Sequence, residues 1–228
     1  MAALSKTQVD HLGDRLRNGP HSEADLRLLD EYRLSFGPSY EFVLHRLREH
    51  SQAPTGRFPK STPSIVEKLR RESIRLSQVQ DIAGCRVIVT NIAQQEKLAN
   101  ELRSDFPSMI IVDRRKTPSH GYRAVHIIVE VGGKHVEIQA RTALQHQWAE
   151  ISEKASDVID ATIKYGGGDD FWRPLLLQSS DFISSCEDME GVNFDATNRK
   201  RLKSYRNSIL KILGYMLLLL DKTKERKA

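Results

Sequence analysis

The chain has 228 residues, 39% of them hydrophobic, and carries a formal net charge of +5. This composition supports one sizeable core and excludes a disordered protein, which would hold fewer apolar residues. Cys85 and Cys186 lie far apart without a metal-ligand spacing, and the sequence opens without a secretory signal pattern, so we expect a reduced, cytoplasmic protein. The longest apolar run, at residues 212–220, is far shorter than the ~20 residues of a bilayer-crossing helix.

The first third of the chain is expected to be helical. Apolar residues at helical spacing predict helices over residues 5–17 and 22–50, the second of them broken at Gly37 and Pro38. Residues 51–60 are rich in proline and glycine and predict a loop. Thr62 and Pro63 are typical of an N-cap and a first turn, and they predict a helix that runs to about residue 75.

The middle of the chain predicts a small sheet. A nearly continuous apolar run at residues 85–91 predicts a buried strand, followed by a helix over 94–104 and a strand over 109–113. Gly132 and Gly133 separate two runs of alternating apolar and polar residues, which indicates a tight hairpin because both glycines tolerate positive φ. A helix over 142–159 follows. This order predicts an α/β (α+β) fold with a mixed sheet flanked by helices.

The rest of the chain is expected to be helical. Glycines at 166–168 predict a break, and two helices follow over residues 171–187 and 197–222. Apolar residues of the last helix recur at intervals of three and four, so it should pack against the body or a second subunit. We therefore expect an N-terminal helical extension over 1–50, a main domain over 51–165 and a C-terminal helical extension over 166–228.

The predicted hairpin places four polar side chains on one face. With the two glycines as its loop, a period-two count brings together Tyr122, His126, Glu137 and Gln139. The other face is apolar and suits packing on helices. Such a face, held by a rigid sheet, suits a binding or catalytic site better than a core. Core or structural roles for Tyr122 and His126 remain alternatives, and no second histidine has a zinc-like spacing.

Positive charge is concentrated in two segments. Residues 57–75 hold six basic and two acidic side chains, and residues 111–126 hold four basic and one acidic. Such focusing indicates a site that receives phosphates rather than a surface that coats nucleic acid along its length. Either segment alone is equally typical of a solvated face.

The predicted helix start at residues 61–64 is a candidate anion site. Lys60 lies just before it, Ser64 in its first turn and Lys68 one turn further on. Unpaired amides and the positive end of the helix dipole add to these groups. An ordinary capped surface helix gives the same pattern.

Three further residues are candidates for chemistry. Asp81 precedes the buried strand and is typical either of a turn or of a Mg²⁺ ligand. Arg86 lies inside that strand and needs a partner, such as a phosphate or a stacked base, because an unpaired buried guanidinium is costly. Glu137 lies mid-strand, where it is either solvent-facing or, together with Asp81, a second metal ligand or general base.

Four ordered segments, RFPKSTPSIVEKL, QDIAGCRVIV, HGYRAVHIIVEV and HVEIQARTALQHQWAEI, resemble the synthetase domain of the RelA/SpoT homologue family, the alarmone synthetases, over residues 45–165. Without a hydrolase domain before it or regulatory domains after it, the chain resembles a single-domain small alarmone synthetase. The resemblance implies a nucleotidyltransferase-like fold. It also implies Mg²⁺-dependent transfer of the β,γ-pyrophosphate of ATP to the 3′-hydroxyl of GDP or GTP, which yields (p)ppGpp and AMP.

The resemblance also implies roles for individual residues. Asp81 corresponds to the metal ligand and Glu137 to a metal ligand or the base. The donor contacts are Arg57, Lys60, Ser64, Lys68 and Arg86. The acceptor contacts are Tyr122, His126 and Gln139, and the neighbouring Arg114 and Lys116 are candidates for acceptor phosphates or a tRNA backbone.

The acceptor segment departs from the family pattern. The usual G-Y-x-S-L-H appears as GYRAVH, which loses a serine hydroxyl and places Arg123 beside the tyrosine. This keeps open a toxin-type relative that pyrophosphorylates tRNA 3′ ends or adenosine nucleotides. A catalytically silent nucleotide- or RNA-binding module is a further alternative, although such a module has no need of both Asp81 and Glu137. The resemblance also implies a homo-oligomer, for which the C-terminal helices are the candidate surface.

Overall fold

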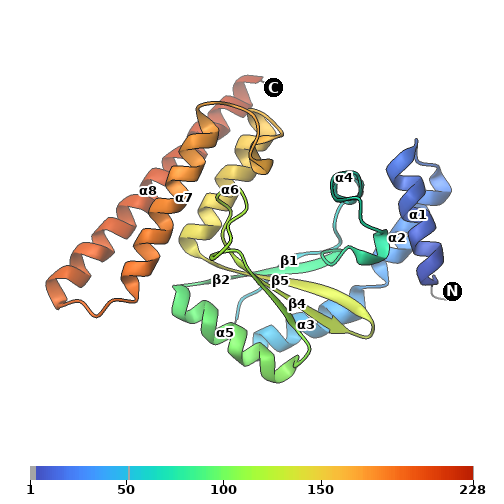
Figure 1. Cartoon of the computed structure of the whole chain (residues 1–228), viewed down its shortest axis with the longest axis horizontal. Coiled ribbons are helices and arrows are strands. Elements are labelled where there is room, and N and C mark those ends of the chain that lie inside the picture. Colours follow the sequence, from blue (N-terminus) through green and yellow to red (C-terminus); the bar gives the residue numbers. More distant parts are fainter. Residues whose placement is uncertain (1–3, 51, 228) are drawn as a thin grey trace. The chain divides into compact units, whose positions relative to one another are not determined.

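The computed structural model describes residues 4–50 and 52–227 (Figure 1). The chain forms two compact units. The first holds residues up to 87, 101–111 and 127–139, and the second holds residues 88–100, 112–126 and those from 140 onward. The predicted division at residues 50 and 165 stays a prediction.

A five-stranded sheet has the strand order β1-β2-β5-β4-β3. Its strands are β1 (Thr55–Arg57), β2 (Ala83–Val89), β3 (Ile110–Asp113), β4 (Val125–Val131) and β5 (Lys134–Thr142). Strand β1 pairs antiparallel with β2, with Arg57 opposite Gly84. The mixed helix and sheet architecture confirms the predicted fold class. The prediction of a loop throughout residues 51–60 is wrong, because β1 lies within it.

The hairpin of β4 and β5 turns where the sequence predicted. Strand β4 ends at Val131 and β5 begins at Lys134. Gly132 and Gly133 have φ of 57° and 72°, as a two-residue turn of type I′ requires. Along β5, buried Val136 and Ile138 alternate with half-buried polar residues, as the predicted apolar and polar faces require. That Tyr122 and His126 share the polar face with Glu137 and Gln139 stays a prediction.

The helices of the first unit are α1 (Lys6–Asn18), α2 (Glu23–Leu34), α3 (Gly37–Glu49) and α4 (Thr62–Glu72). A 3₁₀ turn at Leu76–Gln78 follows α4. The break at Gly37 and Pro38 is confirmed. Ser61, not Thr62, is the N-cap of α4, since its hydroxyl accepts the Ser64 amide. The helix also ends three residues earlier than predicted, at Glu72, and its C-cap Ser73 is left-handed with φ of 50°.

Helix α5 (Ile92–Asp105) follows β2 along the chain. The remaining helices are α6 (Ala143–Val158), a 3₁₀ turn at Ile163–Tyr165, α7 (Trp172–Glu190) and α8 (Ala196–Lys227), all in the second unit. Helices α6, α7 and α8 lie side by side around a core that includes Trp148, Leu176 and Leu213 (Figure 1).

The last helix packs against the core of the second unit with part of its apolar stripe, and packing against a second subunit stays a prediction. Leu213 and Leu220 are buried against the core of the second unit. Tyr205 and Ile212, which the sequence placed on the same packing stripe, are 41% and 59% exposed. Within the described residues, no helix has the length and apolar content that crossing a membrane requires.

Candidate active site

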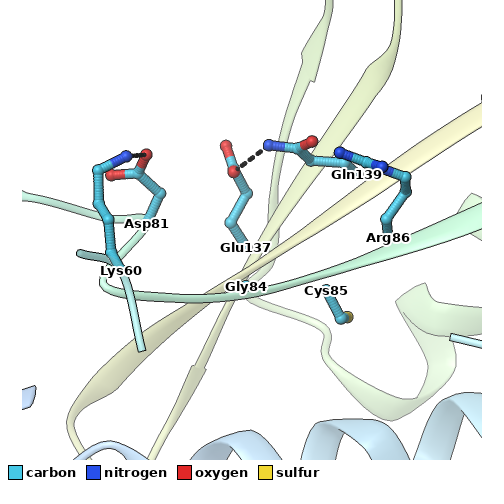
Figure 2. Close-up of a pocket in the computed structure, with 7 residues that line it drawn as sticks. All are labelled: Lys60, Asp81, Gly84, Cys85, Arg86, Glu137 and Gln139. Carbon is cyan, nitrogen blue, oxygen red and sulfur yellow. Dashed lines mark hydrogen bonds and ion pairs between the residues drawn. The ribbon is translucent and has the colours of Figure 1, made fainter. Parts of the chain in front are cut away.

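A pocket of the first unit collects most of the predicted catalytic and donor residues (Figure 2). Most of its side chains are polar and lie on one side of the sheet. They come from the segment before α4, from the segment at the start of β2 and from the middle of β5. The lining residues are Lys60, Asp81, Gly84, Cys85, Arg86, Glu137 and Gln139. Five of these seven were predicted from the sequence as site residues.

Asp81 is held between two ammonium groups. Lys60 Nζ lies 2.7 Å from one carboxylate oxygen and Lys68 Nζ lies 3.0 Å from the other. Burial alone would raise the pKa of Asp81, but the two lysines outweigh it and hold the pKa below its ordinary value. The carboxylate is therefore ionised at neutral pH, as a metal ligand must be.

The backbone fixes both lysines. The Lys60 amide donates to the carbonyl of Ile82, next to Asp81, at 3.0 Å. The Lys60 carbonyl accepts from the guanidinium of Arg33 at 2.9 Å. Lys68 lies on α4, which is anchored by buried residues such as Leu69. These contacts keep the cationic groups on the pocket side.

Glu137 lies at the centre of the pocket, between Asp81 and Arg86 in the view of Figure 2. The Gln139 amide donates to its carboxylate at 2.7 Å. Gly84 lies beside it: a Cβ at this position would lie 3.3 Å from the Glu137 carbonyl oxygen, so a side chain there would crowd the pocket floor. Gly84 thus keeps the space next to Glu137 open.

Two neighbouring residues of the lining, Arg86 and Cys85, differ in burial and in the direction in which they point. Arg86 is half-buried on β2 and lies near Gln139, on the polar side (Figure 2). Cys85 points the opposite way. Burial, with a smaller contribution from the negative charge of Glu137, raises the pKa of Cys85 to about 12. This thiol is therefore protonated at neutral pH, which does not suit a nucleophile.

Two predicted donor residues are placed less directly. Arg57 lies in β1, but its side chain is outside the part of the chain that the structure describes. Ser64 lies in the first turn of α4, and its hydroxyl is 2.8 Å from the hydroxyl of Ser61. Ser64 thus lies at the predicted helix start.

Gln139 lies in the first unit, whereas the other predicted acceptor residues, Arg114, Lys116, Tyr122 and His126, lie in the second. Tyr122 Oη is 2.9 Å from His126 Nε2. Arg141, at the end of β5 and 2% exposed, donates to Tyr122 Oη at 2.8 Å, and its guanidinium lies 5.0 Å from the ring centroid. The sequence prediction missed Arg141. The period-two count that gave Glu137 and Gln139 reaches it at the next step.

The basic loop after β3 is ordered by Asp113. Its carboxylate accepts from Arg115 Nε and Nη2 at 2.9 and 2.8 Å. Arg115 hydrogen-bonds to Asp113, and this lowers the pKa of the acid. The side chain of Lys116 is 81% exposed, and the Arg114 amide donates to the carbonyl of Ala124. Lys116 therefore remains accessible to an anionic ligand.

The carboxylates of the pocket could hold a magnesium ion only together with a bound substrate. Among the described residues, no group of three or more His, Cys, Asp or Glu side chains forms a ready metal cage. Asp81 and Glu137 supply two carboxylates to one pocket. Mg²⁺ typically takes one or two protein carboxylates and completes its shell with phosphate oxygens and water. The two acids match that demand.

Comparison with known proteins decides the family. A model described as a region found in RelA / SpoT proteins matches residues 56–160. The GTP pyrophosphokinase YjbM of Bacillus subtilis is 32% identical over 180 residues, which cover 72% of this chain and 76% of the relative. The chain belongs to the RelA/SpoT family.

Two further proteins are similar to this chain. An uncharacterized protein of Mycobacterium tuberculosis is 32% identical over 202 residues, covering 85% of this chain and 72% of that protein. The crystal structure of small alarmone synthetase 1 from Bacillus subtilis, bound to its product pppGpp, is 26% identical with a TM-score of 0.57 and covers 74% of this chain and 95% of that one. The resemblance stated from the sequence motifs is confirmed. All predicted site residues lie in the RelA/SpoT segment, whereas α7 and α8 lie beyond it.

Proposed function

We propose that the chain is a Mg²⁺-dependent pyrophosphokinase that transfers the β,γ-pyrophosphate of ATP to the 3′-hydroxyl of GDP or GTP and releases AMP. The observation that carries this proposal is the pocket in which Asp81, held by two lysines, lies with Glu137. Pyrophosphoryl transfer needs charge neutralisation, fixed positions and modest base assistance. Membership of the family of the GTP pyrophosphokinase YjbM supports the reaction class.

The donor is ATP, and its binding groups are cationic. Lys60 and Lys68 neutralise phosphate charge, with Ser64 and the α4 amides adding hydrogen bonds at the helix start. Arg86 presents a planar guanidinium for the adenine, and Arg57 is the proposed second jaw of that stack.

Asp81 and Glu137 are the proposed metal ligands. They would hold a Mg²⁺ ion, which would supply positive charge to neutralise the phosphates. Glu137 is also the proposed general base for the acceptor hydroxyl. The bond from Gln139 orients its carboxylate.

The acceptor is a guanosine nucleotide in this proposal. Tyr122 stacks on its base, and His126 and Gln139 contact the acceptor. Lys116 and Arg114 attract the phosphates. Arg141 contacts both the hydroxyl and the ring face of Tyr122, and so it fixes the ring. The ring therefore loses less conformational freedom when a base stacks on it.

The deciding experiment incubates the protein with γ-labelled ATP, Mg²⁺ and, separately, GDP, GTP, ATP or bulk tRNA. We expect label in a 3′-pyrophosphorylated guanosine nucleotide, together with one AMP per transfer. Label in tRNA or in an adenosine product alone would replace the guanosine acceptor with a toxin-type one. No transfer to any acceptor would leave a nucleotide-binding module and overturn the proposal.

A further inference from the structure

The residue that stacks on the proposed acceptor base follows a very tight turn. The amide of Tyr122 donates to the carbonyl of Ser119 at 2.9 Å, and the reverse bond measures 3.3 Å. Between them, His120 and Gly121 have φ of 52° and 88°. Two positive φ values in a row are the geometry of a type I′ turn. A lone two-residue hairpin of this kind is not stable in water, so other contacts must hold it.

Arg123 ties this turn to α7. Its Nε donates to Ser180 Oγ at 3.0 Å and its Nη2 lies 3.0 Å from the Asp181 carboxylate. Its Nη1 donates to the carbonyl of Arg115 at 2.8 Å. All three nitrogens of the guanidinium are thus engaged, and the side chain is only 13% exposed. Arg123 is therefore placed as an internal brace rather than as a surface phosphate contact.

Ser180 of α7 contacts both Arg123 and the turn. It is 1% exposed, accepts the bond from Arg123 and donates its own proton to the Gly121 carbonyl at 2.5 Å. Trp148 of α6 packs beneath the turn, because a Cβ on Gly121 would lie 2.8 Å from its ring. The indole in turn donates to the Leu176 carbonyl of α7 at 2.8 Å.

From these contacts we propose that α7 is a positioning element of the acceptor site, and that Arg123, Ser180 and Asp181 are positioning residues. Their bonds fix the turn that presents Tyr122, and with it the His126 partner of the tyrosine. The inference rests on the proposed function, in which these two residues bind the acceptor. Helix α7 lies outside the segment that the family model matches. The proposed support of the acceptor site therefore comes from the C-terminal part of the chain.

Asp181→Ala is the first test, because the carboxylate is 77% exposed and its loss should not prevent folding. Arg123→Ala and Ser180→Ala follow, with Asp188→Ala as the control, an exposed acid on the same helix. Kinetics are measured with the guanosine nucleotide that the wild-type protein uses. We expect Arg123→Ala to raise the acceptor KM at least about tenfold while the KM for ATP stays within about twofold.

A second readout separates positioning from a general loss of structure. Amide hydrogen exchange of residues 117–124 should speed up in Arg123→Ala and Ser180→Ala, while exchange in β2 and β5 stays as in the wild type. Because the two residues share one bond, the effects of Arg123→Ala and Ser180→Ala on the acceptor KM should also be less than additive.

The outcomes are distinguishable. If the wild-type protein transfers pyrophosphate to no guanosine nucleotide, the proposed function fails. If the wild-type protein is active and Arg123→Ala leaves the acceptor KM unchanged, or raises both KM values equally, the positioning role fails while the proposed function stands. Unchanged exchange in residues 117–124 of Arg123→Ala would also overturn it.

Discussion

Lys60 and Asp81, 21 residues apart in sequence, form an ion pair of 2.7 Å at the edge of the pocket. Lys68 completes the pair from α4 at 3.0 Å. The acid thus joins the α4 segment to the start of β2, and it is also the proposed metal ligand. Substitutions at this position should affect both folding and activity, and the two effects need separate measurements.

Asp81→Asn should lower transfer by at least about a thousandfold, because a neutral amide is a poor Mg²⁺ ligand and removes the negative charge that Lys60 and Lys68 share. The same change should lower the free energy of unfolding by about 1–3 kcal/mol. Steady-state kinetics and urea denaturation give the two values. Asp14→Asn, on an exposed face of α1, is the control. An Asp81→Asn variant with near wild-type turnover would remove the metal role.

The Asp81 ion pairs should also make stability depend on pH. The two lysines hold the pKa of this acid below its ordinary value, so the folded state binds its proton less readily than the unfolded chain. The stabilisation is therefore present above about pH 4 and is lost as the pH falls through the folded pKa. In urea titrations, the difference between wild type and Asp81→Asn should shrink between about pH 5 and pH 2. A difference that grows on acidification would contradict this.

Glu137→Gln should lower kcat by about a hundredfold to ten-thousandfold, the usual contribution of a general base. The amide is isosteric, so the thermal midpoint should stay close to that of the wild type. Glu130→Gln tests the same substitution on the exposed side of the hairpin. Labelled-ATP transfer and a thermal melt are enough for both variants. Equal activity of the two variants would show that Glu137 is not the base.

Tyr122→Ala should raise the acceptor KM, because base stacking on an aromatic ring contributes about 1–3 kcal/mol. The KM for ATP should change little. Tyr122→Phe keeps the ring but loses the hydroxyl that Arg141 and His126 contact, so it should lie between wild type and alanine. Acceptor kinetics that are the same in all three proteins would exclude stacking.

Local patterns were enough to predict the centre of the pocket. Gly132 and Gly133 set the hairpin register, and the period-two rule then placed Glu137 and Gln139 together. Asp81 was found because it directly precedes an apolar strand. Each of these signals is contained within about ten residues, which is the range over which turn chemistry and strand alternation act.

The supporting parts of the site could not be found in this way. Arg123 meets Ser180 and Asp181 across 57 and 58 residues, and no local pattern relates a loop arginine to one particular helix face. Strand β1 was missed because its three residues pair with β2 by tertiary contact rather than by propensity. The sequence predicted the candidate side chains of the site but not the contacts that hold them in place.

Gly121→Ala offers a sharp test of the turn before Tyr122. The alanine would meet two penalties: a φ of 88°, which L residues rarely adopt, and a Cβ 2.8 Å from Trp148. Gly133→Ala is a matched control, since its φ of 72° carries the first penalty but no atom lies within 4 Å of the new Cβ. We expect Gly133→Ala to cost about 1 kcal/mol of unfolding free energy and Gly121→Ala about 1–3 kcal/mol more.

The same pair also separates stability from function. Gly121→Ala should raise the acceptor KM, because relief of the clash with Trp148 must shift the turn that presents Tyr122. Gly133→Ala lies at the far end of the hairpin and should leave both KM values unchanged. Denaturant titration and acceptor kinetics on the two variants supply the comparison. Equal losses of stability, with equal acceptor KM values, would show that the contact between Gly121 and Trp148 does not constrain the turn.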